Sequence, residues 1–145
     1  QKLLRYSNHI IFCFDGDRAG RQAAWKALCV SLPFMQEGIC FQFYNIPEGE
    51  DPDSLIRTMG CDLVEEQMTA SPELTTMLFQ ELHRKYDGND LSAQASFAKE
   101  AMTLINTMPA CIYRELLIEQ LAQEIHLDKS QIEPLLQQPE PKPAL

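Results

Sequence analysis

The sequence lacks any apolar run near the roughly 20 residues that a membrane-spanning helix needs, so we expect no membrane span. It also lacks a basic and apolar leader of the secretory type, and it begins at Gln1 rather than Met. We therefore expect a cytoplasmic protein and interpret the 145 residues as a piece of a longer chain. The composition, 45% hydrophobic and 23% charged, is typical of a globular domain.

Closely spaced cysteine pairs are absent as well. The five cysteines are far apart and include no CxxC pair, and the three histidines are scattered. Structural zinc sites need pairs of ligands at short, regular spacing. We therefore expect reduced thiols and no zinc site in this chain.

Basic residues are few. The chain has 12 Lys and Arg against 21 Asp and Glu, which gives a formal net charge of −9. Taken alone, this charge argues against nucleic-acid binding, because a phosphate backbone attracts basic partners. The acidity is uneven, however: residues 1–60 carry 6 basic and 7 acidic side chains, whereas residues 61–138 carry 5 and 13. The excess negative charge therefore belongs mostly to the second half.

The first part of the chain has a strand–helix–strand pattern. Five consecutive apolar residues separate His9 from Asp15, which favours a strand buried on both faces of a parallel sheet. Apolar positions at helical spacing predict a helix from 18 to about 32, and a second strand follows over 39–46. We expect a βαβ unit with a right-handed crossover.

The remainder is predicted to be helical. Pro52 and Gly60 bound a short helix, since proline is typical just inside a helix start and glycine just past its end. Further helices are predicted over 63–68, 72–86, 92–108 and 112–125, and a capping box formed by Ser130 and Glu133 predicts a last short one. The fold class is therefore α/β followed by all-α, with a helical bundle. We divide the chain into 1–60, 61–136 and a proline-rich linker, 137–145.

Two carboxylates directly follow the first predicted strand. Asp15 and Asp17 flank Gly16, which permits a tight turn, and ligands of open α/β sheets bind at the carboxyl ends of strands. Asp17 also precedes a helix N-terminus, where backbone amides favour phosphate. A carboxylate pair beside phosphate suits Mg²⁺. The equally weighted alternative is that Asp17 only caps the helix and Asp15 only belongs to the turn.

A second pair, Asp51 and Asp53, follows the second predicted strand and emerges at the same edge of the sheet. Two carboxylate pairs at one edge could hold two metal ions. Capping is the favoured alternative for Asp51, because Pro52 occupies the first helical position.

These motifs resemble a known family. Residues 12–21, FCFDGDRAGR, together with 23–28, resemble the DxD motif of the TOPRIM domain in bacterial replicative DNA primases of the DnaG type. Residues 47–55, PEGEDPDSL, resemble the second acidic motif of those primases, and the helical remainder resembles the subdomain that closes their RNA polymerase core. The likeness spans about 3–136.

The resemblance implies a partial TOPRIM fold, a mostly parallel sheet flanked by helices, and a role in making RNA primers for DNA replication on single-stranded template. Carried over residue by residue, Asp15 and Asp17 match the DxD metal carboxylates, and Asp51 and Asp53 match the later acidic pair. All four would then be catalytic ligands of Mg²⁺ or Mn²⁺. Arg18 would pair with phosphate, and a role as a solvated first-turn residue is as well supported.

The resemblance also implies parts that lie outside this chain. These parts are a glutamate after an earlier strand, a zinc-binding domain, a basic part of the polymerase core, and a helicase-binding domain after the proline-rich tail. The parent protein would act on ribonucleotides and single-stranded DNA and bind the replicative helicase. We expect the isolated fragment to bind metal weakly and to make no primers, and we expect its exposed sheet edge to favour self-association.

Three alternatives remain open. Other TOPRIM enzymes, topoisomerases and nucleases, share the DxD motif but not its extension. A haloacid-dehalogenase-type phosphatase would prefer Thr or Val at the position of Ala19 and needs a lysine near the second acidic motif. The helical half could also be a binding module. Its end, 121–136, has a helix-turn-helix pattern, but 131–138 contains no Lys or Arg, so contact with protein fits better than contact with DNA.

Overall fold

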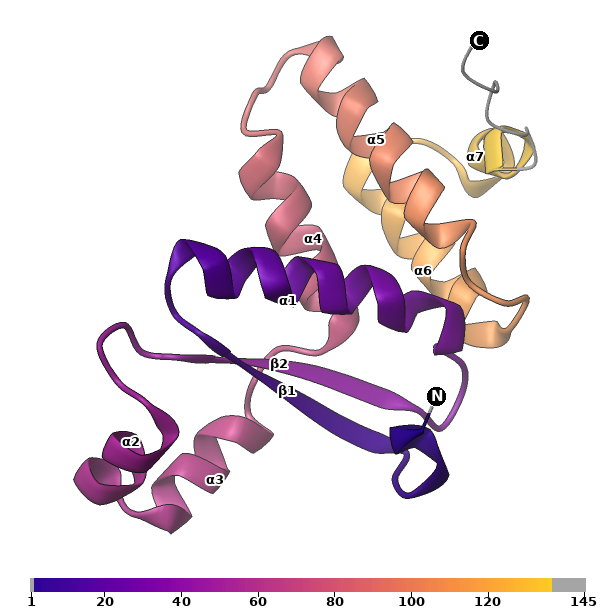
Figure 1. Cartoon of the computed structure of the whole chain (residues 1–145). Coiled ribbons are helices and arrows are strands. Elements are labelled where there is room, and N and C mark those ends of the chain that lie inside the picture. Colours follow the sequence, from indigo (N-terminus) through magenta and orange to yellow (C-terminus); the bar gives the residue numbers. More distant parts are fainter. Residues whose placement is uncertain (1, 137–145) are drawn as a thin grey trace, which may run out of the picture.

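The computed structural model describes residues 2–136. After a 3-10 turn, Leu3–Arg5, strand β1 (His9–Asp15), helix α1 (Arg18–Ser31) and strand β2 (Cys40–Ile46) form the predicted βαβ unit. The two strands are parallel, with His9 opposite Cys40 and Asp15 opposite Ile46 (Figure 1). Both strands therefore end at the same edge of the sheet.

One face of the sheet is aromatic and is covered by α1. Side chains alternate along a strand, so every second residue points to the same face. The ring centroids of Phe12 and Phe43 lie 5.3 Å apart, and α1 places the fully buried Ala24 and Leu28 in the same core cluster. Phe14 and Phe41 extend the row of rings.

The opposite face is covered by two short helices, α2 (Pro52–Met59) and α3 (Cys61–Thr69), which lie below the strands in Figure 1. Leu55 of α2 and Val64 of α3 are buried against Tyr44 and Ile46 of β2. Helix α3 thus packs with the α/β layer, although it begins after residue 60. The domain division at that residue stays a prediction.

The prediction that the first strand is buried on both faces is wrong for the described chain. No residue of β1 is fully buried, and His9, Cys13 and Asp15 are exposed. The physical reason is that, within residues 2–136, β1 pairs only with β2 and forms an edge of a two-stranded sheet.

The free edge of β2 is held by the connection between α3 and α4. Gln42 is 6% exposed, and its side-chain amide donates hydrogen bonds to the carbonyl oxygens of Thr69 (2.9 Å) and Ser71 (2.7 Å). The amide of Phe43 donates to the Pro72 carbonyl at 2.9 Å. A buried polar side chain is tolerated because its hydrogen bonds are satisfied.

The second part is the expected helical bundle, formed by α4 (Leu74–Lys85), α5 (Leu91–Ile105), α6 (Ile112–Ile125) and α7 (Lys129–Leu136). Its buried side chains belong to the same core cluster as those of α1 and β2, so one core joins the two parts. The predicted capping box at Ser130 is wrong. Helix α7 already includes Ser130, and the side chain of Gln131 accepts a hydrogen bond from the amide of Asp128 at 2.9 Å.

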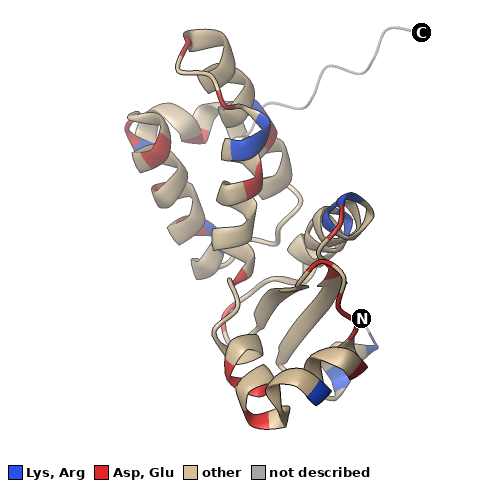
Figure 2. Ribbon diagram, turned by 90° about the vertical axis from the view of Figure 1, so that its left-hand side faces the viewer, with Lys and Arg blue, Asp and Glu red and all other residues tan. Residues whose placement is uncertain are grey.

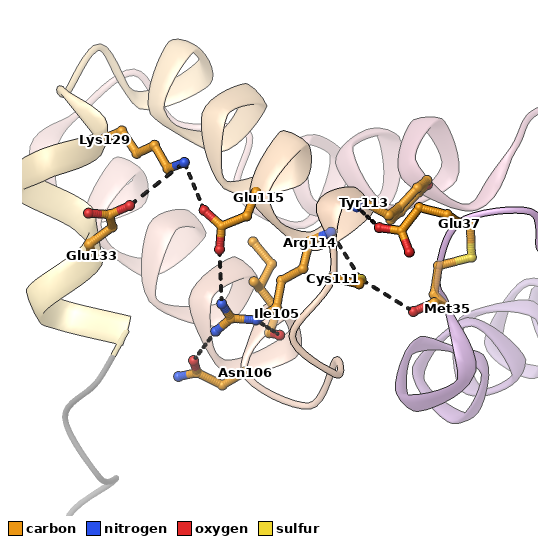
Figure 3. A network of polar contacts seen from close by, with 10 residues as sticks. All are labelled: Met35, Glu37, Ile105, Asn106, Cys111, Tyr113, Arg114, Glu115, Lys129 and Glu133. Carbon is orange, nitrogen blue, oxygen red and sulfur yellow. Dashed lines mark hydrogen bonds and ion pairs between the residues drawn. The ribbon is translucent and has the colours of Figure 1, made fainter.

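Helix α6 is tied to the segment that leads from α1 to β2 (Figure 3). The thiol of Cys111 accepts from the amide of Arg114 at 3.4 Å, as an N-cap does, and contacts the carbonyl oxygen of Met35 at 3.8 Å. The carboxylate of Glu37 accepts from the amide of Tyr113 at 2.9 Å. Backbone amides, its own and that of Tyr113, hold the pKa of Glu37 below its ordinary value.

The other half of the network in Figure 3 links the last helices of the bundle. The ammonium of Lys129 on α7 lies 2.8 Å from Glu115 of α6 and 3.7 Å from Glu133. The guanidinium of Arg114 donates to the carbonyl oxygen of Ile105 at 3.4 Å, at the end of α5. The ends of three helices are thereby joined by polar contacts.

Candidate active site

The turn after β1 contains the first carboxylate pair. Asp15 is the last residue of β1 and is exposed, and Asp17 is the N-cap of α1. Oδ1 of Asp17 accepts a hydrogen bond from the amide of Gly20 at 2.6 Å. The structure therefore shows that Asp17 caps α1. One of its carboxylate oxygens is not used in that bond, so capping does not exclude a second role.

Two glycines bring the turn close to its neighbours. A Cβ atom on Gly16 would lie 2.4 Å from the carbonyl oxygen of Ile46, at the end of β2. A Cβ atom on Gly20 would lie 1.8 Å from the carbonyl oxygen of Asp15. Both contacts are with backbone, which cannot move aside as a flexible side chain can. Glycine at these two positions therefore holds the ends of β1, β2 and α1 together.

The ends of the two strands border one depression of about 470 Å³. Its lining combines the turn after β1 with the loop after β2: Asp15, Gly16, Asp17, Pro47, Glu48, Gly49 and Glu50. The prediction that both acidic pairs emerge at one edge of the sheet is confirmed for the two chain segments that follow β1 and β2. The residues of the second segment that line the depression are Glu48 and Glu50.

The second predicted pair lies one step further along the chain, in the first turn of α2. Asp51 caps α2 by accepting from the amide of Ser54 at 2.7 Å, and the Ser54 hydroxyl accepts from the amide of Asp51 at 3.0 Å. Asp53 is exposed and pairs with Arg57 at 3.0 Å. Neither Asp51 nor Asp53 lines the depression beside Asp15. Their role as metal ligands stays a prediction.

Glu48 and Glu50 are not among the site residues predicted from the sequence. The hydroxyl of Ser54 donates to the carboxylate of Glu50, which places that side chain between the depression and α2. The sequence contains a signal for them, because they follow Ile46 more closely than Asp51 does and ligands gather at strand ends. That signal is weaker than the capping pattern at Asp51 and Pro52.

Arg18, the predicted phosphate-binding residue, is exposed at the first position of α1. It lines a different depression, which lies between α1 and α4. Arg18 directly follows the N-cap residue Asp17 and therefore lies at the start of α1, where backbone amides favour anions. Acidic residues occur in both the α/β layer and the bundle (Figure 2), and they outnumber the basic residues by 21 to 12.

The donor set at the depression consists of carboxylate oxygens, which are hard ligands suited to Mg²⁺ or Mn²⁺. Within residues 2–136, no three His, Cys, Asp or Glu side chains converge closely enough to hold a metal ion by themselves. Mg²⁺ is commonly held by one or two carboxylates, with water and substrate phosphates completing its shell. Asp15 and Asp17 fit that kind of site, and they do not fit an all-protein cage.

Comparison with known proteins matches this arrangement in two parts. A family model described as Toprim-like matches residues 1–56, and a model described as the DnaB-helicase binding domain of primase matches residues 75–130. The chain is 39% identical over 137 residues to the DNA primase of Escherichia coli K12, which is 94% of this chain and 24% of that protein.

Two solved structures are similar throughout. The structure of the DnaG catalytic core matches with a TM-score of 0.86 and 38% identity, covering 91% of this chain and 43% of that one. The structure of the DnaG primase catalytic domain bound to ssDNA matches with a TM-score of 0.85 and 38% identity, covering 90% and 42%.

Fold and matches together define a Toprim-like α/β layer continued by a helical bundle. The chain belongs to the family of bacterial DNA primases of the DnaG type. It spans about a quarter of the length of the curated relatives that it matches. The expected fold class, a partial TOPRIM sheet followed by helices, is confirmed.

The family model that mentions the helicase falls inside the bundle. Residues 75–130 cover nearly all of α4 and the helices up to the start of α7. The sequence alone predicts helicase binding beyond the proline-rich tail, which lies outside the described residues. The matched region therefore lies within this chain, before the proline-rich tail.

Proposed function

We propose that the chain is part of a DNA primase that synthesises RNA primers for DNA replication by metal-dependent nucleotidyl transfer on single-stranded DNA. The observation that carries the proposal is the depression at the carboxyl ends of β1 and β2, where Asp15 and Asp17 lie beside the start of α1. Family membership supports the activity, and one of the similar structures is a primase catalytic domain bound to ssDNA.

In this proposal Asp15 and Asp17, with Asp51 and Asp53 as the later acidic pair, hold Mg²⁺ or Mn²⁺. The ions, when bound, supply charge that stabilises the transferred phosphoryl group and the attacking 3′-hydroxyl. The protein contributes the position of its groups. Gly16 and Gly20 keep the turn against β2 and α1. The first amides of α1 and the guanidinium of Arg18 bind phosphate at the start of that helix.

Primer synthesis by the full-length protein tests the proposal. With ribonucleotides, Mg²⁺ or Mn²⁺ and a single-stranded template, Asp15→Asn is expected to lower synthesis at least 100-fold, because removing one preorganised electrostatic group typically costs roughly that much. Asp62→Asn, an exposed first-turn carboxylate of α3, is the matched control and should leave the rate unchanged. Strand scission in place of nucleotide incorporation would favour a topoisomerase or nuclease instead.

The isolated chain is expected to bind metal weakly and to make no primers. Its two strands and two acidic loops provide only one side of a polymerase site. In the described part of the chain, β2 is the only strand that pairs with β1. Incorporation of ribonucleotides by the purified 145-residue chain would contradict this expectation. The same unpaired edge of β1 is expected to favour self-association, which sedimentation at increasing protein concentration measures.

The replicative helicase is the proposed protein partner of the parent. The family model over 75–130 supports contact through the bundle, and the expectation from the sequence is contact through a domain beyond residue 145. Titrating the helicase with the 145-residue chain separates these locations. Binding by this chain favours the bundle, and binding that requires the longer protein favours the later domain.

Two further expectations concern the parent protein. We expect zinc only in a domain outside this chain and a cytoplasmic location in a bacterial cell. Among the described helices, none has both the length and the apolar character needed to cross a bilayer. Metal analysis of the purified chain and of the full-length protein tests the zinc expectation.

A further inference from the structure

A basic depression lies between α1 and α4 and is separate from the depression lined by Asp15. Its volume is about 580 Å³. Helix α1 contributes Arg18, Arg21 and Trp25, and helix α4 contributes Glu81, Arg84 and Lys85. Residues three, four or seven positions apart share one face of a helix, so two helix faces meet here.

This depression is lined mainly by positive charge, although the chain has a negative net charge. The chain as a whole is at −9, but four cationic side chains and a single carboxylate line this one surface. Glu81 accepts from the guanidinium of Arg84 at 2.6 and 3.1 Å, and Glu100 holds the ammonium of Lys85 at 2.8 Å. Arg84 and Lys85 are therefore fixed by neighbouring carboxylates, and they also lie at the C-terminal end of α4, where cations are favoured.

No neighbouring carboxylate accounts for the positions of the Arg18 and Arg21 side chains. Both are exposed, and neither side chain makes a hydrogen bond or ion pair with any of residues 2–136 that the structure describes. They lie in the first turn of α1, at the positive end of the helix dipole, where carboxylates stabilise and cations do not. Two unpaired guanidiniums at this position favour an anion as the missing partner.

Trp25 gives the depression an aromatic wall. It is half-buried, packs against the main core, and lies one turn beyond Arg21 on the same face of α1. Single-stranded nucleic acids are bound by this combination, with cations along the phosphates and an aromatic ring against a base. An inorganic anion would use the guanidiniums but would not use the part of the ring that lines the depression.

The start of α1 belongs to both depressions, because Asp17 lines the acidic one and the next residue, Arg18, lines the basic one. A strand that passes the carboxylates could therefore continue along α1. We propose that the depression between α1 and α4 binds phosphates of a single-stranded nucleic acid, with Arg18, Arg21 and Arg84 on the phosphates and a base against Trp25. The identity of the ligand as nucleic acid rests on the proposed function.

Trp25 is the chain's single tryptophan, so its fluorescence reports on this surface directly. The 145-residue chain is titrated with a 12-nucleotide single-stranded DNA at several salt concentrations, and separately with ATP. We expect the oligonucleotide to quench the emission, with an affinity that falls as salt rises. Arg21→Gln should weaken binding several-fold and lower the slope of log K against log salt by about 0.7, the value for one phosphate contact on a single strand.

Lys26→Gln is the matched control, because Lys26 is an exposed cation of α1 that does not line the depression. It should bind like the wild type, and Arg18→Gln should repeat the effect of Arg21→Gln. If Arg21→Gln binds the oligonucleotide as tightly as the wild type does, the proposed site is wrong. If ATP quenches the emission with the same affinity as the oligonucleotide, the ligand is a free nucleotide and the proposal of a strand is wrong.

The failure of this inference is distinguishable from failure of the proposed function. Absence of primer synthesis by the full-length wild-type protein would refute the function and leave the fluorescence result standing. Unchanged quenching in both arginine variants would refute the site even if primers are made.

Discussion

Gly20 and Asp15 touch through their backbones: a Cβ atom on Gly20 would lie 1.8 Å from the carbonyl oxygen of Asp15. The first turn of α1 thus rests directly on the end of β1. This contact decides where Asp17 and the first amides of α1 point, and hence whether the acidic depression has its shape.

Gly20→Ala is predicted to destabilise the chain. The added methyl group meets backbone atoms, so α1 must shift, and overpacking of this kind costs about 1–3 kcal/mol. Chemical denaturation should show a lower midpoint with an unchanged slope. Lys26→Ala, an exposed position of the same helix, should change the free energy of unfolding by no more than about 0.5 kcal/mol. A stable Gly20→Ala variant would show that the contact is not restrictive.

Asp17 is predicted to have two separable roles. Asp17→Ala removes the N-cap of α1 and should cost about 1 kcal/mol of stability, whereas Asp17→Asn keeps a capping oxygen and should cost little. Both variants should lower primer synthesis by the full-length protein, because the amide carries no charge for a metal ion.

The control for this pair is Asp90, the N-cap of α5, which accepts from the amide of Ala93 at 2.7 Å. Asp90→Ala should destabilise as Asp17→Ala does, and Asp90→Asn should leave both stability and primer synthesis intact. If Asp17→Asn were as active as Asp90→Asn, Asp17 would be a cap and nothing more.

Asp53 offers a test of the second acidic pair without a change in stability. Its ion pair with Arg57 is exposed, with 85% of the Asp53 side chain accessible, and such pairs contribute at most about 1 kcal/mol. Asp53→Asn is predicted to fold normally and to lower primer synthesis by the full-length protein. If Asp53→Asn stays active and Glu50→Gln does not, the residues lining the depression complete the site instead.

The βαβ unit and the helical bundle were predictable because their signals are local. The apolar run between His9 and Asp15 specified β1, and the proline and glycine that bound 52–59 specified α2. The pairing of Asp15 with Asp17 around Gly16 likewise needed only the turn and the strand end.

Other features depend on contacts between distant segments. Gln42 is buried because the carbonyl groups of Thr69 and Ser71 face it, and neither is near it in sequence. The exposure of β1 follows from its place at the sheet edge, which an apolar run does not reveal. The basic depression combines residues of α1 with residues of α4, which are far apart in the sequence. The net charge of each half of the chain therefore does not reveal it.

Glu100 is predicted to make stability depend on acidic pH. Burial raises its pKa, but hydrogen bonds from Lys85, at 2.8 and 2.9 Å, and from Tyr86 outweigh burial, so the pKa lies below its usual 4.5. A lowered folded-state pKa stabilises the fold above pH 4.5, and this contribution disappears as pH falls through the folded-state value. Glu100→Gln should therefore cost about 0.5–1 kcal/mol at pH 7 and progressively less below pH 4.5.

Denaturation of wild type and variant between pH 3 and pH 7 measures this difference. Glu66→Gln, an exposed carboxylate on α3, serves as the control and should track the wild type at every pH. A Glu100→Gln penalty that stays constant down to pH 3 would mean that packing of the side chain, rather than its charge against Lys85, supports the contact between α4 and α5.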